Sequence, residues 1–278
     1  MKLLLIILIV THQCFSQEAQ INCSYLRTRV VYDFGSSVQY LCMILRQTID
    51  PSAKTFNIVG EHQSGQSDGT VRGILITDSD VAFISKALMD SLFNKFPATT
   101  HVEIFHSRLH NIEPTAFTKG IKVKGIMIAF NNLTTIQDKA FDGLTSLEYL
   151  KIVNSRVQVI SEYAFKDLEN LEKLNLQHNA IRELPKNVFR NMYKLGTVDI
   201  SNNELTVVDG DIFYNSNDLQ YIYISYNNIY AIGENFLAGM TMLNSLYMFQ
   251  NVCVDSFFKY RDESMRGLKV CFENYQNM

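Results

Sequence analysis

Long apolar segments are scarce in this chain of 278 residues. The longest unbroken one runs from Leu3 to Val10, whereas a membrane-spanning helix needs about 20 predominantly apolar residues. We therefore expect no membrane span. Because Lys2 precedes this segment and Cys14-Phe15-Ser16 follows it as a small-x-small cleavage pattern, residues 1–16 are predicted to be a secretory signal peptide. The mature protein is then expected to be secreted and extracellular.

An excess of charge of one sign is also absent. Lysine and arginine number 25, and aspartate and glutamate 28, which gives a formal net charge of −3. A protein whose main partner is nucleic acid or an anionic membrane ordinarily presents a strongly basic surface. The composition therefore argues against both partners.

Cysteine is rare, with five in the whole chain. Removal of the signal peptide takes Cys14 away and leaves Cys23, Cys42, Cys253 and Cys271. An even number of cysteines in an oxidising compartment predicts disulfide bonds.

In contrast, one sequence motif, called the phrase below, recurs every 24 residues. The phrase is a leucine, two residues, an aliphatic, one residue, an aliphatic, two residues, an asparagine, one residue and an aliphatic. Its clearest copy is Leu171, Leu174, Leu176, Asn179 and Ile181. Seven copies and a terminal fragment span roughly residues 71 to 252. A fixed period of this length predicts a solenoid of stacked coils.

The positions of the phrase have separate physical roles. Two aliphatics separated by one residue lie on the same side of a short strand, so their neighbours face outward from a parallel sheet. The asparagine can pair with backbone groups of adjacent coils that would otherwise be buried without partners. Ser107 and Ser155 replace it in two coils. A hydroxyl satisfies fewer groups than an amide, which predicts looser packing in those two coils.

A second series of apolar residues comes eighteen residues into each coil, and its regular spacing predicts a stacked core on the convex side. Its members are Phe117, Phe141, Phe165, Phe189 and Phe213. Leu237 holds the place in the next copy, with Phe236 displaced by one residue.

This phrase resembles the leucine-rich repeat (LRR), in the 24-residue form typical of extracellular proteins. The ends resemble the caps of small secreted insect members of that family. The resemblance implies an α/β solenoid, a curved horseshoe with a parallel sheet on its concave side and loops or short helical turns on its convex side. It also implies binding of macromolecules rather than catalysis.

The solenoid geometry constrains the disulfide pairing. Seven coils stacked at about 4.8 Å place the two ends roughly 30 Å apart, whereas the Cα atoms of a disulfide lie within about 7 Å. The predicted pairs are therefore Cys23–Cys42 and Cys253–Cys271. Each would close a cap, an amino-terminal one over residues 17–70 and a carboxy-terminal one over residues 253–278. The amino-terminal cap is predicted to contain hairpin strands and a mobile loop from Gly60 to Gly69.

The concave face consists of the outward positions of the strands, and its aromatic residues gather at the last two coils. Aromatic side chains, tyrosine above all, contribute strongly to binding at interfaces, and large exposed apolar patches are rare on monomers. The predicted main binding surface is Tyr221, Tyr223, Tyr226, Tyr247 and Phe249. A smaller one is Phe105, Met127 and Phe130, and the polar strip between them is Lys151, Asn175, Gln177 and Asp199. Alternatively, the tyrosines stabilise the sheet by stacking across strands or pack under the carboxy-terminal cap.

No catalytic site, metal site or cofactor is expected. His178, Asp199 and Ser201 fall on neighbouring strands, but an open sheet offers neither a buried acid nor an oxyanion site. The group His101, Glu103 and His106 does not share one strand face, so convergence on a metal is not expected.

The function predicted from the sequence is a secreted, non-enzymatic recognition module that binds an extracellular protein or glycan on its concave face, in innate immunity or development. The alternative is a structural component of extracellular matrix or cuticle. The sequence leaves the oligomeric state open.

Asn22 and Asn132 stand in N-glycosylation sequons, and we expect glycan on Asn132 because it should point outward from the edge of the sheet. N-glycosidase treatment of the secreted wild type should lower its mass. The Asn132→Gln variant should lose that glycan, and a mass unchanged by the substitution would contradict the prediction.

Overall fold

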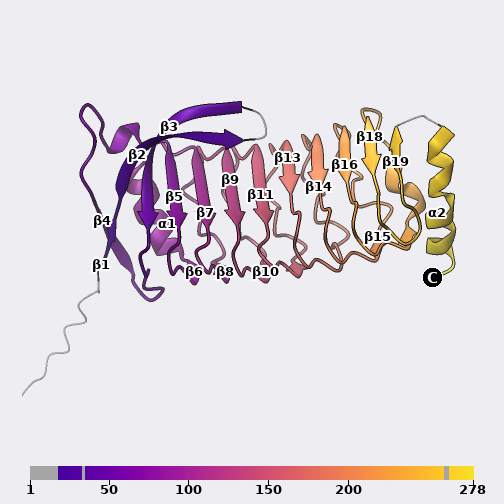
Figure 1. Cartoon of the computed structure of the whole chain (residues 1–278), viewed down its shortest axis with the longest axis horizontal. Helices are drawn as coiled ribbons and strands as arrows, with labels where there is room; N and C mark the ends of the chain where they lie inside the picture. The colour runs from indigo at the N-terminus through magenta and orange to yellow at the C-terminus, as the bar shows by residue number, and fades with distance from the viewer. Residues whose placement is uncertain (1–17, 33–34, 260–262) are drawn as a thin grey trace, which may run out of the picture.

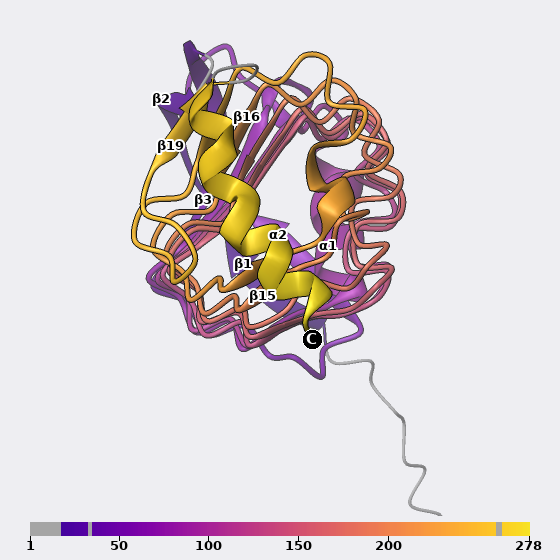
Figure 2. The same cartoon turned by 90° about the vertical axis from the view of Figure 1, so that its right-hand side faces the viewer.

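The computed structural model describes residues 18–32, 35–259 and 263–278 and has the form of a solenoid (Figure 1). Its coils lie behind one another when the molecule is viewed along its long axis (Figure 2). The predicted signal peptide lies outside the described residues.

One sheet of eleven strands runs the length of the molecule. Its strands in spatial order are β2 (Ser24–Tyr32), β3 (Gly35–Leu45), β5 (Gly73–Thr77), β7 (His101–Phe105), β9 (Gly125–Ala129), β11 (Tyr149–Val153), β13 (Lys173–Asn175), β14 (Thr197–Asp199), β16 (Tyr221–Tyr223), β18 (Ser245–Tyr247) and β19 (Phe257–Lys259). All neighbours from β3 to β18 are parallel, and from β9 to β18 each residue pairs with the one 24 positions further on, as Leu174 does with Val198. The 24-residue period is therefore the register of the sheet.

The other side of each coil is made of short strands and turns. Three small parallel pairs occur there: β6 (Phe83–Ile84) with β8 (Asn111–Ile112), β10 (Thr135–Ile136) with β12 (Val159–Ile160), and β15 (Val207–Val208) with β17 (Ala231–Ile232). The coil between β5 and β7 is longer, with an offset of 28 residues, and contains helix α1 (Lys86–Lys95). Ser85 caps this helix by accepting a hydrogen bond from the Leu88 N–H.

The phenylalanine series fills the convex side of the core. Ring centroids of Phe117, Phe141 and Phe165 follow one another at 6.0 Å, and Phe189 and Phe213 lie 5.4 Å apart. The expectation that Leu237 continues the series is wrong. Phe236 is buried with its ring 5.8 Å from Phe213, because the short helix η2 (Glu234–Leu237) turns the chain so that the preceding residue faces inward.

A ladder of asparagine side chains joins each coil to the one before. The Oδ1 atom of Asn227 accepts from the Leu205 N–H at 3.0 Å, and its Nδ2 donates to the carbonyls of Ile200 at 3.0 Å and Ile224 at 3.2 Å. Equivalent bonds come from Asn131, Asn179, Asn203 and Asn251. One amide thus satisfies polar backbone atoms of two coils in the interior, where water cannot replace it.

Serine fulfils part of this role where it replaces asparagine. The Ser107 hydroxyl donates to Phe105 at 2.6 Å and lies 3.4 Å from the Ile76 carbonyl. The N–H groups of Ser107 and Ser155 are in turn taken up by Asn131 and Asn179 of the next coils. Both serines are fully buried. Each serine coil is therefore linked by hydrogen bonds to the coils on both sides.

Disulfides close both ends. Cys23 and Cys42 join the hairpin of β2 and β3 with Cα atoms 5.1 Å apart, and Cys253 and Cys271 join the last coil to α2 (Lys269–Gln276) at 5.2 Å. These are the predicted pairs. A short helix, η3 (Glu263–Leu268), precedes α2, which packs against β17. Neither of these helices, nor any other in the described part of the chain, has the length and apolarity that a bilayer crossing requires.

The amino-terminal cap holds a further parallel pair, β1 (Glu18–Asn22) with β4 (Thr55–Val59). The loop from Gly60 to Gly69 runs on into a short helix, η1 (Asp68–Thr70), and is fastened by His62 rather than free. The His62 ring lies 3.1 Å from the Tyr40 hydroxyl and 2.8 Å from the Asp68 carboxylate, which also pairs with Lys95 of α1. The expectation of a mobile loop overlooked these contacts.

The asparagine ladder can be tested at one rung. Asn227→Ala leaves a buried N–H and buried carbonyls without partners, so we expect a loss of about 2–4 kcal/mol in the free energy of unfolding. The neighbouring exposed residue supplies a control, since Asn228→Ala removes the same amide from the surface. Urea denaturation of both variants measures the difference, and equal stability of the two would contradict the role given to the ladder.

Candidate ligand-binding face

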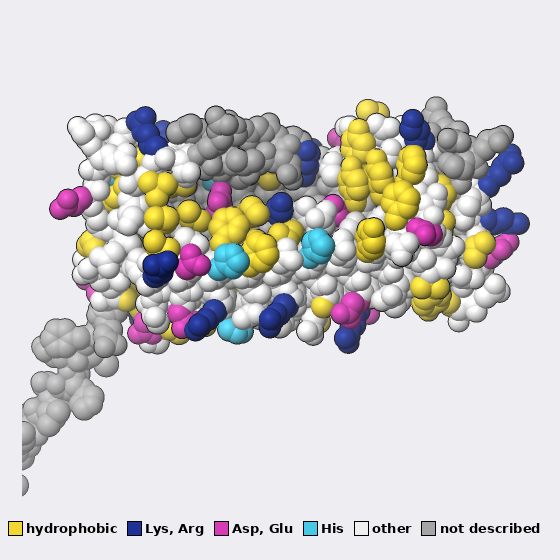
Figure 3. Space-filling view, in the orientation of Figure 1, with side chains coloured by type: hydrophobic (Ala, Val, Ile, Leu, Met, Phe, Trp, Pro, Cys, Tyr) yellow, Lys and Arg dark blue, Asp and Glu magenta, His cyan; other side chains and the backbone are white. Residues whose placement is uncertain are grey.

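The outward side chains of the eleven-stranded sheet form the concave face, and two separate groups of hydrophobic side chains lie on it (Figure 3). The short strands fix each side chain by register, since alternate residues of β16 and β18 point into the core and the others point outward. The buried Ile222 lies between Tyr221 and Tyr223 of β16, and the buried Leu246 precedes Tyr247 of β18.

The larger group is the aromatic cluster, which consists of Tyr221, Tyr223, Tyr247, Phe249 and Phe257. Tyr223 and Tyr247 stack across the two strands with centroids 4.6 Å apart and planes at 10°. Phe257 of β19 continues the stack 5.8 Å from Tyr247 and also lies 6.1 Å from Phe249. Cross-strand stacking of this kind stabilises a sheet, yet Phe249 and Phe257 remain exposed.

Tyr226 follows the end of β16 in a left-handed turn with φ of 56°. Its backbone N–H donates to the Phe249 carbonyl at 2.7 Å, and no ring contact joins its side chain to the five aromatics within the described residues. Every coil makes the same turn one residue before its asparagine or serine. That Tyr226 belongs to the binding surface stays a prediction.

The smaller group lies near the other end of the sheet. Phe105 and Met127 are half-buried on β7 and β9, and Phe130 is exposed in the turn after β9. The Phe130 ring stacks on His106 with centroids 4.7 Å apart and planes at 8°. The predicted residues of this smaller surface are thus close together in the fold.

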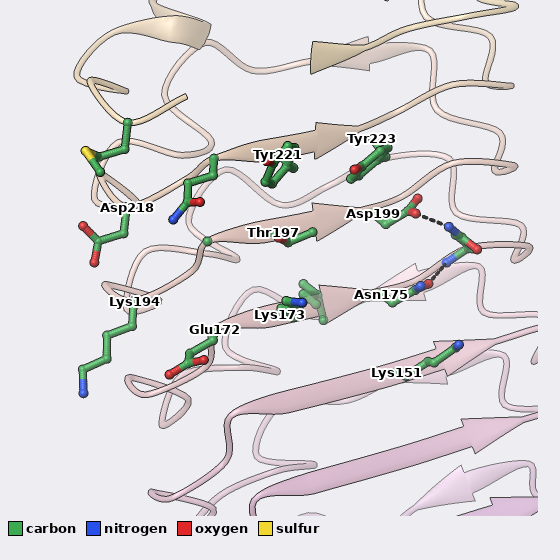
Figure 4. Close-up of a pocket in the computed structure, with 15 residues that line it drawn as sticks. Lys151, Glu172, Lys173, Asn175, Lys194, Thr197, Asp199, Asp218, Tyr221 and Tyr223 are labelled. Carbon is green, nitrogen blue, oxygen red and sulfur yellow. Dashed lines mark hydrogen bonds between the residues drawn. The ribbon is translucent and has the colours of Figure 1, made fainter. Parts of the chain in front are cut away.

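Between the two groups runs the predicted polar strip. The Gln177 N–H donates to Asn175 at 3.0 Å, and the Gln177 amide donates to the Asp199 carboxylate, which also accepts from the Ser201 N–H at 3.0 Å. Burial raises the pKa of Asp199, and its hydrogen bonds with Ser201 and Gln177 oppose this shift. The strip is therefore internally bonded, with Lys151 at its end (Figure 4).

A hollow of about 880 Å³ opens where this strip meets the aromatic cluster. Tyr221 and Tyr223 line it on one side and Lys151 and Lys173 on the other, and Thr197 and Asp199 of β14 lie between them (Figure 4). Gly196, which precedes β14, also lines it. Sequence reasoning missed both Gly196 and Phe257. The space beside Gly196 becomes visible only when the side chains of the neighbouring coils are placed in three dimensions. Phe257 joins the face only because β19 pairs antiparallel with β18.

His178, Asp199 and Ser201 are not arranged as a catalytic triad. The Asp199 carboxylate accepts from Ser201 and Gln177. His178 meets Ser201 through its backbone N–H, which donates to the Ser201 carbonyl at 3.2 Å, and within the described residues no hydrogen bond joins the His178 ring to Asp199 or Ser201. No group of three or more histidine, cysteine, aspartate or glutamate side chains in the described part of the chain is placed to hold a metal ion.

A parallel-strand solenoid with a ladder of asparagine side chains and disulfides at both ends defines a repeat protein, and folds of this class offer an extended concave surface suited to recognition. The model of the BspA type leucine rich repeat region matches six copies within residues 110–244. The chain is a leucine-rich repeat protein. No curated protein matches it.

Among solved structures, the chain is similar to the crystal structure of a TLR13–ssRNA13 complex, with a TM-score of 0.60 and 21% sequence identity. The match covers 72% of this chain but 29% of that one. At this identity the likeness shows the fold alone, and the bound RNA is a property of that protein.

The buried His101 makes stability depend on pH. Its side chain lies 2.8 Å from the Thr100 hydroxyl and 3.1 Å from the Gln39 side chain, and burial, with a smaller contribution from Lys124, lowers its pKa from 6.5 to about 4. Between these values the unfolded chain binds a proton that the folded chain does not. Stability is therefore lost as pH falls from 6.5 toward 4, by up to about 3 kcal/mol.

His101→Gln should reduce this pH dependence while other acid-sensitive groups remain. Chemical denaturation of wild type and variant at pH 7.5 and pH 4.5 measures the difference. The stability gap between the two proteins should move in favour of the variant at the lower pH, and a constant gap would contradict the assignment.

Proposed function

We propose that this protein is a secreted, non-enzymatic recognition module that binds an extracellular protein on its concave face. The observation that carries the proposal is the aromatic cluster beside a polar hollow on the outward face of the sheet. Tyrosine rings with polar rims are the side chains that most often dominate binding energy at protein interfaces.

The charges of the hollow favour a protein over a nucleic acid. Its lining includes Lys151, Lys173 and Lys194, but also Glu172, Asp199 and Asp218. A single-stranded RNA would need a basic groove along its backbone beside the stacking rings, and three carboxylates oppose this. Balanced charges of both signs suit a folded protein surface, which itself carries both.

Secretion is supported by the two disulfides, which form in oxidising compartments. The apolar segment Leu3 to Val10 supplies the export signal in this proposal, with cleavage after Ser16. The resemblance of the caps to those of small secreted insect proteins stays a prediction.

A structural role in extracellular matrix or cuticle is the second candidate, and the ends of the sheet favour it. β2 is the terminal strand and is nine residues long, and no described strand pairs with its outer edge. Exposed edges of this kind can pair with other chains. Such a protein would form large assemblies at micromolar concentration, which light scattering coupled to size-exclusion chromatography detects.

The recognition proposal is tested with Tyr223→Ala/Tyr247→Ala in a pull-down from extracellular fluid. Removal of the central stacked pair should weaken partner binding by roughly 30-fold or more, as for residues at the centre of an interface. Tyr163 and Tyr214, which are exposed in turns beside Phe165 and Phe213, give a matched control pair. The double alanine variant of that pair should bind like the wild type. If all three proteins capture the same partners equally, the concave face is not the binding site.

A further inference from the structure

The hollow beside the aromatic cluster has different side chains at its two ends along the axis of the solenoid. Lys151 on β11 and Lys173 on β13 line one end, where Glu172 also lies, whereas Tyr221 and Tyr223 of β16 line the other. Asp199 on β14 pairs in register with Tyr223, and Thr197 pairs with Tyr221. Because neighbouring strands are about 4.8 Å apart, Lys173 lies two spacings from β16, roughly 10 Å, and Lys151 three spacings, roughly 14 Å.

The room in the hollow comes from one missing side chain. The positions equivalent to Gly196 in the neighbouring coils hold larger polar side chains, namely Glu148, Glu172, Gln220 and Asn244. A Cβ atom at Gly196 would meet its nearest neighbours, the carbonyl oxygens of Glu172 and Asp218, at 3.7 Å and 3.8 Å. These are ordinary contacts, so the backbone does not require glycine here, and its effect is to leave the space above the sheet open.

The aromatic end of this space is suited to a cation. The faces of tyrosine rings carry negative partial charge and attract cations, and Tyr221 and Tyr223 present their rings side by side with planes at 17°. The Asp199 carboxylate uses one acceptor position for Ser201 and one for Gln177, and a carboxylate has about four such positions. A guanidinium group fits this pairing better than an ammonium, because it is planar, stacks on rings and donates several hydrogen bonds.

We propose that the hollow at Gly196 receives an arginine side chain of the protein partner, stacked on Tyr221 and Tyr223 and hydrogen-bonded to Asp199. An acidic side chain of the same partner then faces Lys151 and Lys173. The two contacts together fix the orientation of the bound partner along the axis of the solenoid. This inference rests on the proposed function and names the chemistry that the concave face selects.

The test uses short peptides as probes and the full-length secreted protein with isotope-labelled tyrosine rings. Acetyl-Gly-Arg-Gly-amide should shift the ring resonances of Tyr221 and Tyr223 in a saturable manner, whereas the leucine and glutamate counterparts should not. Asp199→Asn should weaken the arginine peptide about five- to tenfold, since it removes the charge at nearly constant shape. Gly196→Gln introduces into the hollow the side chain that Gln220 has at the equivalent position of the next coil. This variant should abolish the shifts of the tyrosine resonances.

Thr206→Gln serves as the control, because it introduces the same side chain at an exposed position outside the hollow. Thermal unfolding establishes whether each variant is folded. If Gly196→Gln is unfolded, the arginine-peptide affinity of Asp199→Asn relative to wild type decides whether the proposal holds. The proposal is overturned by an equal response to the glutamate peptide, by no response in the wild type, or by full binding in both hollow variants.

The partner pull-down separates this inference from the function on which it rests. If Gly196→Gln retains the partner while Tyr223→Ala/Tyr247→Ala loses it, the recognition function stands and the arginine site is wrong. If neither variant loses the partner, both proposals fail.

Discussion

The hydrogen-bonding demand of the backbone between coils is the constraint on which this structure depends. A parallel stack encloses strand ends and turns that water cannot reach, and each buried N–H or carbonyl left unpaired would cost about 1–3 kcal/mol. An asparagine, or the serine that replaces it in some coils, meets this demand for two coils at once. From β9 to β18 the constant offset of 24 residues places each of these side chains at the same position of its coil, and the bond between Ser79 and Ser107 joins two coils across an offset of 28 residues.

Because the register assigns the interior, it also determines which residues are free for other roles. Aliphatic residues and phenylalanines fill every coil in the same positions, and the outward positions of the sheet carry no such requirement. Those positions hold Phe105 and Met127 in one stretch, bonded polar groups in the next, and stacked aromatics at the end. The variety on this face, set against the uniformity beneath it, is what makes recognition the function that the fold supports.

The sequence predicts the repeat, the sheet, the core and both disulfide pairs, because each follows from a spacing that one chain displays by itself. It fails where a residue's direction depends on a local turn. Phe236 instead of Leu237 enters the core because η2 shifts the chain by one position. It fails also where distant segments meet, as Phe257 does with Tyr247 and His62 with Tyr40. Neither encounter has a periodic signal.

The constant register gives the distance between the two apolar groups an unusual origin. The smaller group, Phe105, Met127 and Phe130, belongs to coils near the amino-terminal cap. The aromatic cluster, which includes Phe257, lies at the carboxy-terminal end, and whole coils separate the two groups. Duplication or loss of one 24-residue segment in the gene would leave both caps, both disulfides and every ladder bond type intact, and would change the separation by one strand spacing of about 4.8 Å. Gain or loss of repeats can therefore change the distance between the two apolar groups in steps of one strand spacing while both caps stay the same.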